Sequence, residues 1–85
     1  MTKPLSLDLM REDVAAMIQI DSAEIGDDDN LMDLGLDSMR AMNLMLLWQE
    51  RGVELDFSQM ATRPTLAGWW QLVKRRINEI AEARS

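Results

Sequence analysis

Residues 38–51 predict a helix that is apolar on two sides. Its apolar residues form two stripes at helical spacing: Met39, Met42 and Leu46 on one side, and Ala41, Leu44, Met45 and Trp48 on the other. One stripe must face a core, and a helix that is apolar all round is normally buried all round. A chain of 85 residues has too few helices to surround one of them. The second stripe is therefore either covered by a loop and a short helix, or left exposed for partner proteins.

Two further long helices are predicted. The first runs from about residue 7 to residue 20, with Ser6 as its N-cap and Leu5 packing against Met10 as a hydrophobic staple. The last begins after Thr65, a favourable N-cap. It carries a stripe expected to face the core: Leu66, Trp69, Trp70, Val73, Ile77, Ile80 and Ala81.

Two other segments connect these helices. Residues 21–37 contain seven acids, no base and two glycines, and are expected to form a long loop. Apolar residues recur in it and predict an ordered loop attached to the core: Ile25, Leu31, Leu34 and Leu36. After Gly52, the expected C-terminal cap of the second helix, Asp56 can cap a short helix that Pro64 ends.

The composition excludes several classes of function. A net charge of −6 argues against nucleic-acid binding, which needs a clustered basic face. The absence of Cys and His removes disulfides, thiolate metal sites and the commonest general base. No apolar run resembles a signal peptide or a membrane span. We therefore expect one all-α domain over residues 1–85, a bundle of three main helices and one short helix. We expect it to be cytoplasmic, monomeric and without a membrane segment or a metal.

The acidic run from Asp27 to Asn30 raises calcium binding as an alternative. An EF-hand loop needs alternating oxygen ligands, a glycine at its sixth position and a glutamate at its twelfth. No register that starts at Asp27, Asp28 or Asp29 provides them, so a solvated loop is favoured.

Ser38 stands where the second helix is expected to start. Serine is a preferred N-cap, so a capping role alone could explain it. It cannot act as an autonomous nucleophile, because the chain has no His to activate it. A helix N-terminus stabilises anions through free N–H groups and the macrodipole, however. A phosphodiester on Ser38 Oγ would lie in that field, which would make Ser38 the substrate of another enzyme.

The segment DLGLDSMR, residues 33–40, resembles the LGxDS modification motif of phosphopantetheine-dependent carrier proteins. The resemblance extends over almost the whole chain and is strongest to aryl carrier domains of siderophore-type nonribosomal peptide synthesis. Those domains share GLDSxRxM, a Trp ten residues after the serine, and the pairs DF, PT and WW, here Trp48, Asp56-Phe57, Pro64-Thr65 and Trp69-Trp70. Fatty-acid carriers usually have Leu directly after the serine and acidic residues soon after it, whereas this chain has Met39 and Arg40. The GGxS motif that peptidyl carriers more often show is absent. Known aryl carrier domains are often fused to an isochorismatase.

This resemblance implies a non-catalytic carrier. Ser38, with Asp37 beside it in the motif, would receive 4′-phosphopantetheine from CoA through a phosphopantetheinyl transferase. An aryl-acid adenylating enzyme would load an acid such as 2,3-dihydroxybenzoate or salicylate as a thioester, and a condensation domain would accept it. The positions implied to contact partners are Gly35, Met39, Met42, Phe57 and Ala61.

Several alternatives remain open at this point. The cargo could be another acyl or aminoacyl group, as in a D-alanyl-type carrier. The chain could also be an unmodified helical adaptor whose exposed methionine stripe binds one partner. Phe57 could be a core residue instead of a contact residue. Gly35 indicates either a positive φ or the close approach of a partner backbone.

Overall fold

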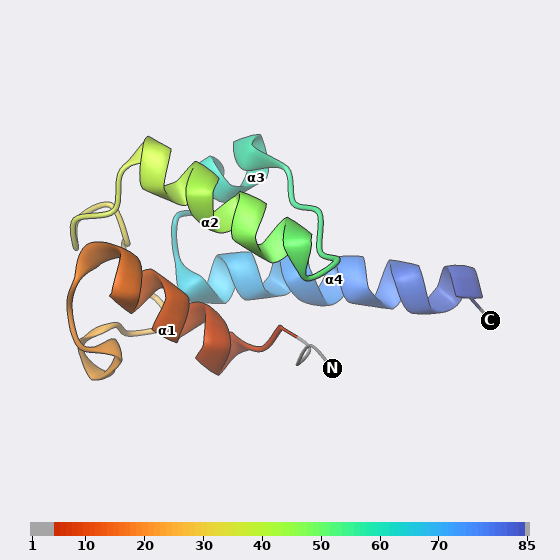
Figure 1. The fold of residues 1–85 in the computed structure, drawn as a ribbon, viewed down its shortest axis with the longest axis horizontal. Helices are drawn as coiled ribbons and strands as arrows, with labels where there is room; N and C mark the ends of the chain where they lie inside the picture. The colour runs from red at the N-terminus through yellow and green to blue at the C-terminus, as the bar shows by residue number, and fades with distance from the viewer. Residues whose placement is uncertain (1–4, 85) are drawn as a thin grey trace.

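The computed structural model describes residues 5–84 and confirms the all-α prediction. Within these residues the chain forms four α-helices and one short 3-10 helix, with no strand. In chain order they are α1 (Leu7–Ile18), η1 (Ser22–Glu24), α2 (Ser38–Glu50), α3 (Phe57–Thr62) and α4 (Leu66–Arg84) (Figure 1). No helix of this described part is both long enough and apolar enough to cross a bilayer.

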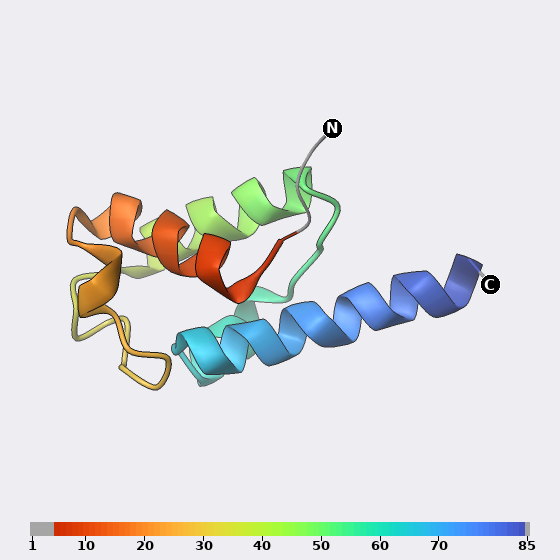
Figure 2. The same ribbon diagram turned by 90° about the horizontal axis from the view of Figure 1, so that it is seen from below.

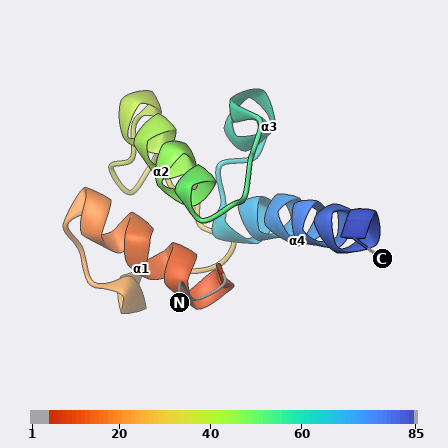
Figure 3. The ribbon, with the colours of Figure 1, turned by 45° about the vertical axis from the view of Figure 1, so that its right-hand side comes forward.

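The helices pack around the first half of α4. Helix α1 contacts both α2 and α4, and α3 contacts α2 (Figure 3). The C-terminal half of α4 extends beyond the other helices (Figures 1 and 2). The stripe predicted along this helix is therefore buried only at its start, where Leu66, Trp69 and Val73 are inaccessible to solvent. The expectation that Ile80 and Ala81 face the core is wrong, because no other helix lies beside that end.

Two tryptophans form the centre of the core. Trp48 and Trp69 are fully buried, and their rings meet edge to face with centroids 5.9 Å apart. Each indole Nε1–H donates a hydrogen bond of 2.9 Å, from Trp48 to Asp13 Oδ2 and from Trp69 to the carbonyl of Met60. These bonds satisfy the polar edge of two buried rings and connect α2 to α1 and α4 to α3. Trp70 was also expected in the core, but it is only half-buried.

The predicted N-caps of three helices are confirmed. Ser6 Oγ accepts from the N–H of Leu9 at 3.2 Å, and Asp56 Oδ1 accepts from the N–H of Ser58 at 2.8 Å. Thr65 Oγ1 likewise accepts from the third residue after it, at 3.0 Å. Each cap satisfies one backbone donor that the first turn of a helix leaves free.

The helix C-termini differ slightly from the prediction. Helix α1 ends at Ile18, two residues early, because Gln19 adopts a left-handed conformation with φ of 60°. Helix α2 ends at Glu50, and Gly52 follows with φ of 90°. This positive φ lets the N–H of Val53 reach the carbonyl of Trp48 at 3.1 Å, while the N–H of Gly52 bonds to Gln49 at 2.9 Å. Such a pair of bonds is the Schellman motif for which a glycine is preferred.

The loop between α1 and α2 is ordered, as predicted. Ile25, Leu31 and Leu36 are buried in the core, and Leu34 is half-buried. The N–H of Leu31 donates to the carbonyl of Pro64 at 2.8 Å, and the N–H of Ala67 donates to that of Asp27 at 2.9 Å. The loop is therefore bonded to the segment that starts α4. The short helix η1 within it was not predicted, because three residues are too few to show a helical period.

The acidic run of this loop is engaged with the protein itself. Asp27 forms an ion pair with Arg11, whose guanidinium also donates to the carbonyl of Ile25 at 3.1 Å. Asp29 Oδ2 accepts from the N–H of Gly26 at 2.8 Å. Across residues 5–84, no three acidic side chains gather into a group that could hold a metal ion.

Candidate functional site

A tight turn brings the chain to the start of α2. The N–H of Leu36 reaches back five residues to the carbonyl of Leu31 at 3.1 Å, and both side chains are buried. Gly35, between them, has φ of 114°, a conformation that L-residues rarely adopt. The positive φ expected as one explanation of Gly35 is thus confirmed. A Cβ built there would meet no atom within 4 Å, so the glycine is needed for its backbone and not for space within the chain.

Asp37, and not Ser38, caps α2. Its Oδ1 accepts from the N–H of Arg40 at 2.8 Å, and its carbonyl accepts the first helical bond, from Ala41 at 2.9 Å. Ser38 is therefore the first residue inside the helix, and the capping role considered for it is wrong. Aspartate is at least as good a cap as serine, and its position one residue earlier takes over that role. The hydroxyl of Ser38 is therefore not needed to cap the helix.

Ser38 lies in the open on the protein surface. Its side chain is exposed, and among the described residues no hydrogen bond uses its hydroxyl. No Lys or Arg occurs between residues 12 and 39, so Arg40 is the first cation after a long acidic stretch. Its Nη1 donates to the carbonyl of Gly35 at 3.3 Å. Arg40 therefore links the turn before Ser38 to the helix that starts there. This role was not predicted from the sequence, and the only signal for it was the position of Arg40 two residues after the serine.

The two apolar stripes of α2 have different surroundings. Ala41, Leu44 and Trp48 are buried, so this stripe faces the core. The other stripe is exposed: Met39 at 76%, Met42 at 47% and Leu46 at 53%. The alternative in which α3 and the long loop cover this stripe is therefore wrong. We call Met39, Met42 and Leu46 the exposed α2 stripe; it begins at the residue that follows Ser38.

Helix α3 separates its apolar residues into three environments. Met60 is fully buried, Phe57 is half-buried against the core, and Ala61 is exposed. Met60 therefore points inward while Ala61 points to solvent. Phe57 is neither a pure core residue nor a pure contact residue, because one part of it packs against the core and another part is accessible.

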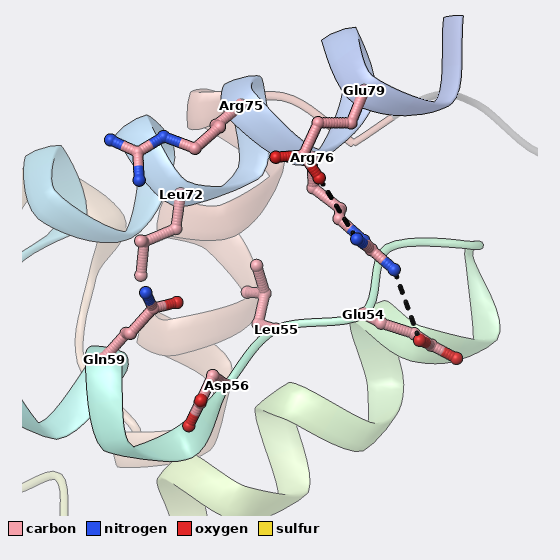
Figure 4. Close-up of a pocket in the computed structure, with 8 residues that line it drawn as sticks. All are labelled: Glu54, Leu55, Asp56, Gln59, Leu72, Arg75, Arg76 and Glu79. Atoms are coloured by element: carbon pink, nitrogen blue, oxygen red, sulfur yellow. Dashed lines mark hydrogen bonds and ion pairs between the residues drawn. The ribbon is translucent and has the colours of Figure 1, made fainter. Parts of the chain in front are cut away.

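A pocket of about 480 Å³ lies between α4 and the segment that joins α2 to α3 (Figure 4). Arg76 spans it, with Nη2 at 3.5 Å from Glu54 and Nη1 at 3.1 Å from Glu79. None of the predicted site residues lines this pocket. Its lining comes from residues 54–59 and from α4, and none of its lining residues belongs to α2 or to the turn before it. The pocket is therefore separate from the candidate site.

The family model that describes the phosphopantetheine attachment site matches residues 8–73. The chain belongs to this family. The cofactor predicted from the sequence is thereby confirmed, since members of the phosphopantetheine attachment-site family bind 4′-phosphopantetheine covalently. Carrier domains of this family carry a group for other enzymes and do not themselves catalyse its chemistry.

Several characterised proteins are similar to this chain. Enterobactin synthase component B of Escherichia coli (strain K12) is 39% identical over 74 residues, which cover 87% of this chain and 26% of that protein. Isochorismatase of Bacillus subtilis (strain 168) is 35% identical over 71 residues, 84% of this chain and 23% of that protein. Acyl carrier protein ScoB of Streptomyces coeruleorubidus is 34% identical over 76 residues, 89% of each chain. No solved structure matches the chain significantly.

The chain spans about a quarter of the length of the first two of these relatives. The matches confirm the resemblance inferred from the motifs, that of an aryl carrier within the phosphopantetheine-dependent carrier superfamily.

Proposed function

We propose that Ser38 carries the 4′-phosphopantetheine arm and that the protein holds an aryl acid on it as a thioester. The observation that supports attachment at Ser38 is its exposed hydroxyl at the first position of α2, free of hydrogen bonds while Asp37 provides the cap. A transferase can therefore reach Oγ without breaking an interaction that stabilises the helix.

The backbone at this point suits the phosphodiester of the arm. The N–H groups of Ser38 and Met39 belong to the first turn and donate to no group in the described part of the protein. Free donors at a helix N-terminus, together with the positive end of the macrodipole, favour a negative charge. The exposed guanidinium of Arg40 adds a positive charge to the same turn.

Other serines are less suited to attachment. Ser6 Oγ already accepts the capping bond of α1, and Ser22 is half-buried in η1. Ser58 is exposed in the first turn of α3, two residues after the capping aspartate Asp56, to which its N–H donates. It lies outside the GLDS motif and at the second position of its helix instead of the first, and it therefore provides a control for an exposed serine near a helix start.

The aryl cargo is supported by the relatives and by the motifs. Enterobactin synthase component B matches most of this chain, and a synthase named for a phenyloxazoline, MbtB of Mycolicibacterium paratuberculosis, is 41% identical over 64 residues. We therefore propose 2,3-dihydroxybenzoate or salicylate as the class of acid. The partners would be a phosphopantetheinyl transferase, an aryl-acid adenylating enzyme and a condensation domain.

A second candidate is a carrier for another acyl group. It is favoured by acyl carrier protein ScoB, which matches this chain over 89% of its own length. The two candidates share Ser38 and the arm and differ only in cargo. Loading the arm-bearing protein with aryl-acid and fatty-acid or amino-acid activating enzymes in parallel separates them. Thioester formation with the aryl acids alone supports the first proposal.

The attachment site is tested by intact mass after incubation with CoA and a broad-specificity phosphopantetheinyl transferase. The native protein and Ser58→Ala should each gain one phosphopantetheine, and Ser38→Ala should gain none while keeping its helical circular dichroism. Modification of Ser38→Ala, or its loss in Ser58→Ala, would show that the arm is attached elsewhere. A native protein that gains no mass would favour the unmodified adaptor.

A further inference from the structure

The methionines of this protein differ widely in their access to solvent. The sequence has eight of them and no cysteine, so methionine is its only source of sulfur. Met10 and Met60 are completely buried, and Met17, Met32 and Met45 are half-buried. Met39 and Met42 are the exposed members of the described set, at 76% and 47%. The two most exposed methionines of the described part thus lie together on one surface.

That surface is the exposed α2 stripe. Met39 follows Ser38 directly, and Met42 lies one turn further along the same side of α2. Buried residues behind them hold the helix in place, so both side chains stay on the surface whatever rotamer they adopt. Two flexible thioethers therefore provide the apolar surface beside the proposed attachment site.

We propose that Met39 and Met42 form a peroxide-sensitive modification site that controls docking of the condensation partner at this surface. In the reaction a sulfur lone pair attacks one peroxide oxygen, an S–O bond forms and the O–O bond breaks. The other oxygen leaves as hydroxide and takes the proton from the oxygen now bound to sulfur, which gives water. The thioether is oxidised to a sulfoxide and hydrogen peroxide is reduced to water. The functional half of this inference rests on the proposed carrier function.

The sulfoxide changes the character of the surface. A flexible apolar group becomes polar and chiral, which disrupts methionine-rich interfaces. A carrier meets its partners through a small transient interface, where a few apolar side chains supply much of the affinity. Sulfoxides at both positions should therefore slow the partner reactions without unfolding the protein, because the exposed α2 stripe contributes little to the core. Methionine sulfoxide reductases restore the thioether, so the change is reversible.

The first experiment maps the oxidation. The protein with an unmodified Ser38 is treated with graded hydrogen peroxide, so that no arm thiol competes, and the peroxide is removed with catalase. Peptide mass spectrometry should find sulfoxide at Met39 and Met42 well before Met10 and Met60, with an unchanged melting curve. Equal rates at exposed and buried methionines, or unfolding that accompanies the first oxidation, would overturn the assignment of the site.

The second experiment measures the consequence. For each protein, an oxidised and an untreated sample receive the arm and an aryl acid, and the condensation rates of the two samples are compared. We expect kcat/KM to fall about fivefold to tenfold on oxidation, and to recover after treatment with both classes of sulfoxide reductase. In the double variant Met39→Leu, Met42→Leu the ratio of oxidised to untreated rates should stay near one. The control Met17→Leu, Met32→Leu should remain sensitive.

The outcomes separate this inference from the proposed function. Oxidation of Met39 and Met42 with unchanged arm attachment, loading and condensation would overturn the regulatory role while leaving the carrier function intact. A peroxide effect that persists in the Met39→Leu, Met42→Leu protein would do the same. If the untreated protein accepts no arm, the carrier function fails, and the oxidation map still decides whether the site exists.

Discussion

The indole Nε1 of Trp48 donates to Asp13 Oδ2 at 2.9 Å, and this hydrogen bond connects the buried centre of α2 to α1. Trp48 has no solvent exposure, whereas Asp13 is half-buried. The indole N–H has no other partner in the described structure. Only this carboxylate replaces the hydrogen bond to water that the indole loses on burial.

Asp13→Ala should therefore lower the free energy of unfolding by about 1–3 kcal/mol, the cost of a buried donor left without an acceptor. Asp13→Asn keeps an acceptor oxygen and should lose less. Thermal or urea unfolding followed by tryptophan fluorescence measures both changes. The neighbouring exposed Glu12 provides the control, since Glu12→Ala should shift stability by less than about 0.5 kcal/mol. Equal losses at positions 12 and 13 would show that the hydrogen bond contributes nothing.

Asp37 and Ser38 should contribute differently to the stability of the protein. Asp37→Ala removes the cap of α2 and should cost about 1 kcal/mol. Ser38→Ala removes no hydrogen bond and should cost less than about 0.5 kcal/mol, while abolishing attachment of the arm. Chemical unfolding together with intact mass measures both properties. A Ser38→Ala protein that is less stable than Asp37→Ala would contradict the assignment of the cap.

Two substitutions at Gly35 can separate backbone strain from contact with a partner. Any L-residue at a φ of 114° should be strained by about 1–3 kcal/mol. The space around the position is open, so Gly35→Ala and Gly35→Asp should melt at similar temperatures. If a partner backbone approaches here, Gly35→Asp should show slower arm attachment or aryl transfer than Gly35→Ala, measured well below the melting temperature. Equal activities of the two variants would leave the glycine with a purely structural role.

Helix α3 provides a test of the condensation interface. Ala61 is exposed, so Ala61→Glu should leave stability, arm attachment and aryl loading unchanged while slowing condensation. The matched control is Ala16→Glu on α1, an alanine that is also exposed and that should leave every step unchanged. Condensation that proceeds at the native rate in Ala61→Glu would exclude this part of α3 from the interface.

Phe57→Ala should affect both stability and condensation. Because the ring is half-buried, the loss in unfolding free energy should fall below the roughly 3–5 kcal/mol of a fully buried phenylalanine. Condensation should also slow, because the accessible part of the ring is lost. Unfolding curves paired with a condensation assay decide between the roles. A strongly destabilised variant with native condensation would make Phe57 a core residue only.

Local signals in the sequence predicted most of the fold. Helical periodicity located the three long helices, and side chains that bond to their own backbone marked the starts at Ser6, Asp56 and Thr65. These features depend on residues three or four positions apart, so they can be recognised without knowledge of the tertiary structure. The same locality explains why Gly35 and Gly52 were recognised as special, since a positive φ is a property of one residue and its neighbours.

The candidate site was predicted in part by the same means. The GLDS motif indicated Ser38 as the attachment residue, and the double apolar pattern of α2 revealed that one stripe needed a partner or a cover. The sequence could not show which stripe would be exposed, because that depends on where α1, α3 and α4 pack. Nor could it distinguish Asp37 from Ser38 as the cap, because both are good N-caps and the choice depends on where the turn at Gly35 releases the chain.

By itself, then, the sequence determined the helices, their caps, the carrier motif and the ordered acidic loop, because each follows from local spacing and side-chain chemistry. Tertiary packing alone decided that Met39, Met42 and Leu46 stay exposed, that Phe57 is half-buried, and that Ile80 lies beyond the bundle. Burial depends on which surfaces meet across the chain. An apolar residue on a helix is equally suited to a core or to a partner until the neighbouring helices are in place.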